Sequence, residues 1–204
     1  MIGILIIPNA FAEITITDDA TGGDCASIGT WDSASRTCTF TSDVSESVVV
    51  GANYITLDGN GHTLDFGATS YAACNYADDQ KYGINFNAKT NLVIKNFTIK
   101  KFCNGMNFAN SISNSILDNT MTENFNIGLY IGNSNDNIIS NNVITNNGYE
   151  GLYIEYSVDD VISNNVFTDN GIGDSGWIVN LKINSSEGFT ITGNTVSASG
   201  NGLA

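Results

Sequence analysis

Positive charge is what this sequence has least of. Only 7 of its 204 residues are Lys or Arg, against 21 Asp or Glu, and the formal net charge is −14. After Lys101 the only basic residue is Lys182. Nucleic acids and anionic membranes are bound through clustered Lys and Arg, so we expect neither as a partner. Acidic polysaccharides would be repelled for the same reason unless a cation bridged them.

Nitrogen and sulfur ligands for metals are also scarce. His62 is the only histidine, and the four cysteines contain no C-x-x-C spacing, which argues against a zinc site. Four cysteines allow three pairings. We predict the two more local ones, Cys25–Cys38 and Cys74–Cys103, and such disulfides are typical of an exported protein.

Long apolar runs are missing as well. The first residues, MIGILIIPNAFA, form a short apolar run that is far too short to span a membrane. The run ends in Ala10-Phe11-Ala12, an A-x-A pattern that suits signal peptidase. We interpret residues 1–12 as the end of a secretion signal cut before Glu13, with a buried first strand as the alternative. No membrane insertion is expected.

What the sequence does contain is a repeat. Its apolar content of 42% is enough for the core of one domain. Gly83, Gly105, Gly128 and Gly151 recur at steps of 22, 23 and 23, and each opens a similar phrase such as GLYI. After a longer step Asn180 takes the same place, followed by Gly202. An isoleucine follows each opener by eleven residues, at Ile94, Ile116, Ile139, Ile162 and Ile191.

A repeat this short, with strand-like alternation and no helical stretch, must stack on copies of itself to bury its apolar face. We therefore predict an all-β parallel solenoid with about 23 residues per coil, rising by about 4.8 Å per coil. Two inward rows are expected, one at Ile84, Met106, Leu129, Leu152, Leu181 and Leu203, and the other at Phe86, Phe108, Ile131, Ile154 and Ile183.

Asparagine is abundant at one register of the repeat. The stretch GLYIGNSNDNIISNN, residues 128–142, contains five. Asparagine tolerates left-handed backbone angles at corners, and its amide both donates and accepts hydrogen bonds. Stacked asparagines can therefore bond one another along the solenoid. We expect such a ladder at Asn119, Asn142, Asn165 and Asn194.

This pattern resembles the right-handed parallel β-helix repeats of the pectate-lyase-like superfamily, and most closely its branch of NosD-like and carbohydrate-associated surface proteins. The phrase YITLDGNGHTLDF at 54–66 and the phrase IISNNVITNNGYEGLYI carry the resemblance. It implies a single-stranded right-handed β-helix over most of residues 44–204. It does not imply one activity, because this fold hosts lyases, hydrolases, adhesins and surface proteins.

We divide the chain into the signal remnant 1–12, an N-terminal cap with a disulfide loop at 13–43, and the β-helix at 44–204. The sequence stops at Gly202-Leu203-Ala204, just as a new coil begins. Because proteins normally cover an open strand edge, we expect a further domain or a second copy to dock there.

The acidic residues suggest two kinds of site. Asp136 and Asp159 take equivalent places on adjacent coils, and Asp160 follows, so the three could offer oxygen ligands to calcium. Glu155 lies on the outward side of its strand, and together with Asp159 it could serve a polysaccharide-degrading hydrolase, which needs two carboxylates. The alternative is that all of these are solvated turn residues, and we assign no catalytic pair.

The resemblance brings two further activities, neither of which the residues favour. A lyase would need calcium-binding aspartates and a basic residue, but the only arginine is Arg36, in the cap, and Lys182 is the only lysine on the later coils. NosD itself is linked to copper, which prefers His, Met or Cys ligands, and these are few here. We expect that no cofactor is required, with calcium as the one metal that the residues suggest.

Exposed aromatic side chains beside carboxylates are typical of sugar-binding surfaces. Tyr130 and Tyr153 take the same outward place on adjacent coils, and Glu155 and Tyr156 extend that surface. Outward tyrosines also stabilise a sheet by cross-strand packing, which is the alternative. We predict an exported, cell-surface-associated, non-catalytic module that binds a polysaccharide or glycan, or has a structural role. The alternatives are the hydrolase and a solenoid that assembles end to end as a filament or adhesin.

Overall fold

The computed structural model describes residues 13–70, 74, 81–171 and 179–197. The predicted signal remnant at 1–12, Leu203 of the first inward row and the predicted docking edge at Gly202-Leu203-Ala204 lie outside these residues.

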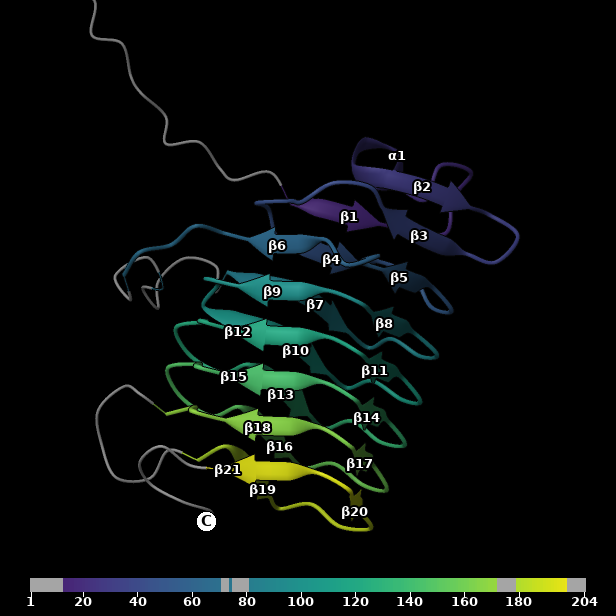
Figure 1. The fold of residues 1–204 in the computed structure, drawn as a ribbon. Coiled ribbons are helices and arrows are strands. Elements are labelled where there is room, and N and C mark those ends of the chain that lie inside the picture. The colour runs from purple at the N-terminus through teal and green to yellow at the C-terminus, as the bar shows by residue number, and fades with distance from the viewer. Residues whose placement is uncertain (1–12, 71–73, 75–80, 172–178, 198–204) are drawn as a thin grey trace, which may run out of the picture.

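The chain winds into a stack of coils with three strands per coil, which build three long sheets (Figure 1). Sheet A contains β1 (Ile14–Ile16), β4 (Val48–Val50), β7 (Tyr82–Asn87), β10 (Asn104–Ala109), β13 (Leu129–Gly132), β16 (Leu152–Glu155) and β19 (Leu181–Asn184). Sheet B contains β2 (Gly29–Asp32), β3 (Thr37–Phe40), β5 (Thr56–Asp58), β8 (Val93–Lys95), β11 (Ser115–Leu117), β14 (Ile138–Ser140), β17 (Val161–Ser163) and β20 (Thr190–Thr192). Sheet C contains β6 (Thr63–Asp65), β9 (Thr98–Lys100), β12 (Thr120–Thr122), β15 (Val143–Thr145), β18 (Val166–Thr168) and β21 (Thr195–Ser197).

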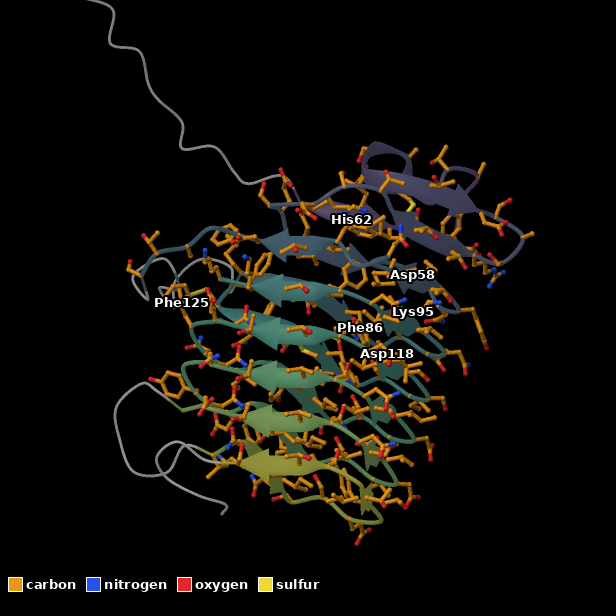
Figure 2. All side chains as sticks on the ribbon, viewed as in Figure 1. Asp58, His62, Phe86, Lys95, Asp118 and Phe125 are labelled. Carbon is orange, nitrogen blue, oxygen red and sulfur yellow. A yellow bond between two sulfur atoms is a disulfide. The ribbon has the colours of Figure 1, made fainter. Side chains whose placement is uncertain are left out.

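The register confirms the predicted parallel β-helix. Met106 of β10 pairs with Leu129 of β13, and Leu129 pairs with Leu152 of β16, so each of these two coils adds 23 residues. These side chains are fully buried. Phe86 of the second inward row lies inside the stack, where its ring stacks on that of Phe108 at 4.7 Å between centroids (Figure 2). The two apolar rows form the core because alternate residues of each strand point inward.

The N-terminal end of the stack carries an extra layer. The helix α1 (Cys25–Ile28) and the antiparallel hairpin of β2 and β3 lie over the first coils (Figure 1). Both predicted disulfides are confirmed, with Cα–Cα distances of 5.8 Å for Cys25–Cys38 and 5.4 Å for Cys74–Cys103. Sheet A already begins at β1, inside the region that we assigned to the cap, because β1 pairs in parallel with β4.

The apolar side chains of the last described coil are less buried than those of the preceding coil. Ile191 of β20 is 50% exposed, whereas Ile162, its partner in β17, is fully buried. Leu181, Ile183 and Val196 of the same coil are only partly buried. Among the described residues, the apolar side chains of this coil therefore pack against the preceding coil only.

Side-chain amides hydrogen-bond in series at the buried corner between sheets B and C. Asn119 Nδ2 donates to Asn142 Oδ1 at 3.2 Å, and Asn142 and Asn165 donate in the same way to the next asparagine at 3.0 Å. Each Oδ1 also accepts the backbone N–H of the asparagine one coil earlier, as Asn142 Oδ1 does from Asn119 at 3.0 Å. The ladder of Asn119, Asn142, Asn165 and Asn194 thus supplies hydrogen-bond donors and acceptors at a corner that water cannot reach.

Two further ladders, which the sequence analysis did not identify, lie at the other corners. One runs through Asn114, Asn137 and Asp160. The other runs through Asn124, Asn147, Asn170 and Asn180. Their 23-residue spacing, up to Asn170 and Asp160, was visible in the sequence and could have revealed them.

We expect Asn142→Ala to lower the free energy of unfolding by about 2–4 kcal/mol, because it removes the acceptor of two Asn119 donors and leaves the buried Ile116 carbonyl without its amide donor at 2.8 Å. Urea denaturation measures this. Asn87→Ala is the control, because that exposed side chain accepts one hydrogen bond, from Asn110. Equal losses in the two variants would contradict a structural role for the ladder.

Candidate functional site

The outward side of sheet A carries a row of polar and aromatic side chains that crosses five coils. Residue pairing between β7, β10, β13, β16 and β19 places its members opposite one another. They are Asn85, Asn107, Tyr130, Tyr153 and Lys182. Two residues further along the strands, Glu155 lies between Gly132 and Asn184. The predicted row of Tyr130 and Tyr153 is therefore present, and Lys182 extends it.

Both tyrosines converge on one carboxylate. The Tyr130 hydroxyl donates to Glu155 Oε1 and the Tyr153 hydroxyl donates to Glu155 Oε2, each at 2.7 Å. The two rings meet edge to face, with centroids 5.7 Å apart. Tyr130, Tyr153 and Glu155 hold one another through these contacts, so both rings are fixed in place before any ligand binds.

A glycine makes this geometry possible. Tyr130 reaches Glu155 on the neighbouring strand across Gly132, which pairs with Glu155. A Cβ atom at position 132 would lie 2.5 Å from the Tyr130 hydroxyl oxygen. The missing side chain therefore leaves the space in which the phenol lies.

Burial, followed by the hydrogen bond to Glu155 and its charge, raises the pKa of Tyr130 above its ordinary value. The same causes raise the pKa of Tyr153. Both phenols are thus neutral donors at ordinary pH, and neither is suited to act as a base.

Lys182 completes the arrangement. Its Nζ atom lies 4.5 Å from the centroid of the Tyr153 ring and 3.1 Å from Glu150 Oε1. A cation over an aromatic face is attracted by the ring, so Lys182 is held by two partners. We call Tyr130, Tyr153, Glu155 and Lys182 the platform.

Tyr156 lies beside the platform at the corner after β16. It is 57% exposed, and its backbone is left-handed, with φ of 51°. The corresponding corners carry Asn110, Asn133 and Ser185 at similar angles. A bulky side chain is disfavoured in this region of backbone space, whereas asparagine tolerates it. The structure thus holds an exposed ring at some cost in backbone energy.

Two cavities that are lined by described residues lie away from the platform. One of about 590 Å³ lies at the N-terminal end between Ile14, Ile28 and Val44, and one of about 370 Å³ lies at the corner near Asn60 and Asn96. Neither is lined by platform residues.

The three aspartates considered as calcium ligands do not converge. Asp136 and Asp159 occupy left-handed corner positions, with φ of 57° and 59°. Asp160 is fully buried, and its Oδ1 accepts from the backbone N–H and the Nδ2 of Asn137 at 2.8 and 2.9 Å. Within the described ranges, no group of three or more His, Cys, Asp or Glu side chains could hold a metal ion. The arrangement gives no support to the calcium hypothesis.

Comparison with known proteins identifies the family and the fold. Residues 28–204 match the family model described as periplasmic copper-binding protein (NosD). No curated protein matches the chain. Among solved structures, the full-length tailspike protein 2 from Escherichia coli O157:H7 bacteriophage CAB120 is similar, with a TM-score of 0.60 and 13% identity over 82% of this chain and 24% of that chain.

Two further structures are similar. The enzymatically active domain of bacteriophage CBA120 tailspike protein 2 has a TM-score of 0.52 and 15% identity, over 83% of this chain and 42% of that chain. The A-module of the Azotobacter vinelandii mannuronan C-5 epimerase AlgE4 has a TM-score of 0.42 and 13% identity, over 87% of this chain and 56% of that chain. The chain spans less than half the length of both tailspike chains, and at these identities the likeness shows the fold alone.

The described residues do not fit a copper site. Copper prefers His, Met and Cys ligands. His62 Nδ1 lies 3.2 Å from Asp43 Oδ1, and Met106 and Met121 are fully buried in the core. All four cysteines are in disulfides. No helix in the part of the chain that the structure describes is long and apolar enough to cross a membrane.

Asp160 predicts a pH-dependent stability. Burial, with a contribution from nearby Asp136 and Asp159, raises its pKa to about 6, and its Oδ2 has no hydrogen-bond partner. Since the folded pKa lies above the unfolded value, this residue's contribution to stability is fully present below about pH 4. It is lost as the pH rises through about 6, at a cost of about 3 kcal/mol at most.

We therefore expect Asp160→Asn, which completes the ladder with an amide, to be more stable than the parent by about 1–3 kcal/mol at pH 7.5 and to lose most of that advantage at pH 3.5. Urea denaturation at both pH values is the measurement. Asp159→Asn is the control, because it removes the same charge from an exposed neighbour. A pH-independent difference for Asp160→Asn would contradict the buried, protonated carboxyl.

Tyr156→Asn should raise the free energy of unfolding by about 0.5–1 kcal/mol, because asparagine suits the left-handed corner better than tyrosine does. Thermal denaturation checks this. The control is Asn133→Tyr, the reverse change at the equivalent corner one coil earlier, which should be destabilising. If Tyr156→Asn lowered stability, the ring would be contributing packing, and the strain argument would not hold.

Proposed function

The chain belongs to the NosD family, whose description is periplasmic, and on that premise we propose that it is an exported, non-catalytic module that binds a polysaccharide along the outward face of sheet A. The two disulfides are in keeping with export, because such bonds persist in oxidising compartments.

The observation that carries this proposal is the joint anchoring of Tyr130 and Tyr153 by Glu155. Aromatic rings offer an apolar face to the C–H side of a sugar ring, and neighbouring hydroxyl and carboxylate oxygens accept hydrogen bonds from its hydroxyl groups. Because the rings are already ordered, binding would cost little further side-chain entropy.

The shape of the face also suits a polymer. Asn85, Asn107, Tyr130, Tyr153 and Lys182 lie in one row across five adjacent strands, spaced by about 4.8 Å per strand. A row of that length spans several sugar units along the axis of the solenoid. A small ligand would favour an enclosed pocket, whereas an extended chain can lie on a flat face.

The carboxylates of this face are already held in hydrogen bonds and an ion pair, which supports sugar binding over hydrolysis. A glycosidase needs two carboxylates with distinct roles, one of them a proton donor. Here Glu155 accepts two phenol hydrogen bonds, and Glu150 is paired with Lys182. Asp159, the other candidate, lies at an exposed corner after Tyr156 and not on the strand that carries Glu155.

End-to-end assembly is a second candidate role. The observation that favours it is the 50% exposure of Ile191 on the last described coil, where its partner Ile162 is fully buried. A second copy that docked on this side would cover an apolar surface. This role and polysaccharide binding use different surfaces and do not exclude each other.

The test is affinity electrophoresis of residues 13–204 against neutral and acidic polysaccharides. We expect retardation by at least one neutral polysaccharide and a loss of affinity of about tenfold or more in Tyr153→Ala, because a central aromatic contact is removed. Tyr153→Phe keeps the ring but removes the hydroxyl that Glu155 anchors, so it should lose less affinity than Tyr153→Ala does.

Tyr54→Ala serves as the control, because it removes an exposed tyrosine ring beside Arg36, on the N-terminal part of the stack and away from sheet A. Retardation that is lost equally in Tyr54→Ala and Tyr153→Ala would contradict a site on sheet A. The absence of retardation by any polysaccharide would contradict the proposed function and leave end-to-end assembly as the remaining candidate.

A further inference from the structure

Lys182 is the only basic residue after Lys101, so it is the only side chain on the later coils that could attract an anionic ligand. On the earlier coils Lys95 is paired with Asp58 at 3.0 Å, and Lys100 with Asp65 at 3.3 Å (Figure 2 shows Asp58 beside Lys95). Whether the platform binds an acidic polymer therefore depends on whether the charge of Lys182 is neutralised by a neighbouring group.

Glu150 neutralises that lysine. The carboxylate precedes β16, its side chain is only 10% exposed, and its Oε1 lies 3.1 Å from Lys182 Nζ. The lysine side chain is 40% exposed. A carboxylate buried to this degree is costly to leave without a partner, so the pair should persist when a ligand binds. A polymer carboxylate would have to displace a group that the fold holds beside the lysine at high effective concentration.

The remaining charges on this face are also unfavourable to anions. Glu155 lies next to the two tyrosines, and with Glu150 and Lys182 the three charged groups sum to −1. The phenol hydrogens of Tyr130 and Tyr153 already point to Glu155, so both hydroxyls are left with lone pairs to offer. Such a face suits the hydroxyl groups of a neutral sugar, which can donate to those lone pairs.

We infer that Glu150 is a specificity-determining residue, which pairs with Lys182 and so restricts the platform to neutral polysaccharides. This inference rests on the proposed function, since it names the ligand class of the same face. Glu150 has no direct role in holding the sugar, and it acts by setting the charge that the ligand meets.

The test is Glu150→Gln, which keeps the shape and an acceptor oxygen but removes the negative charge. We expect the apparent affinity for polygalacturonate at low salt to rise by about fivefold or more, because Lys182 is no longer neutralised. The gain should disappear at high salt and in Glu150→Gln/Lys182→Gln. Affinity for the neutral polysaccharide should change by less than about twofold, since contacts with the rings are unaltered.

Glu187→Gln is the matched control, because it removes one negative charge from an exposed corner residue and should produce no gain. Glu150→Ala provides a second test should Glu150→Gln fold poorly, because it also removes the charge that pairs with Lys182 and should give the same gain for polygalacturonate at low salt. No gain in a folded Glu150→Ala variant would overturn the inference.

Three other outcomes separate this inference from the proposed function. If the native protein binds the neutral polysaccharide through Tyr153 but Glu150→Gln gains no affinity for polygalacturonate, the role of Glu150 is wrong and the platform stands. The same holds if the native protein already binds polygalacturonate as tightly as the neutral polymer. If neither the native protein nor Glu150→Gln binds any polysaccharide, the proposed function fails, and the inference fails with it.

Discussion

The hydrogen bonding of side-chain amides at the buried corners is the interaction on which this structure depends. Between strands the chain must turn, and at each turn backbone groups point into a region that water does not reach. Asn119, Asn142, Asn165 and Asn194 satisfy these groups by bonding to one another and to backbone atoms of the adjacent coil. The ladder works only if successive coils turn at the same place, so it fixes the register between coils even where one coil is longer than the others.

A constant register between coils has a direct consequence for the outer surface. Residues one coil apart lie opposite each other on adjacent strands, and this is what brings Tyr130, Tyr153 and Lys182 into one row. Outward side chains are not constrained by the packing of the core. The platform is therefore a local feature on a repetitive scaffold: Gly132 leaves room for Tyr130, and Glu155 and Glu150 fix the groups around it.

Much of the fold could be predicted from the sequence because the repeat is visible as a pattern of residue types. The inward rows, the pairing of the cysteines and the position of the tyrosine row all follow from spacing. The buried position of Asp160 was not predicted, although its 23-residue spacing from Asn137 was the available signal. The hydrogen bond from Tyr130 to Glu155 depends on the missing side chain at Gly132. The ion pair of Glu150 with Lys182 spans a coil of irregular length. Neither interaction could therefore be predicted from residue spacing.

The central claim is that the outward face of sheet A is the binding surface. The most direct measurement is a titration of the isotope-labelled protein with neutral oligosaccharides, followed by the chemical shifts of its backbone amides. The account predicts that the shifts change in β13, β16 and β19 and at the corner of Tyr156, and change little in sheets B and C. Shift changes centred on sheet B or sheet C, or the absence of any change across the panel, would contradict it.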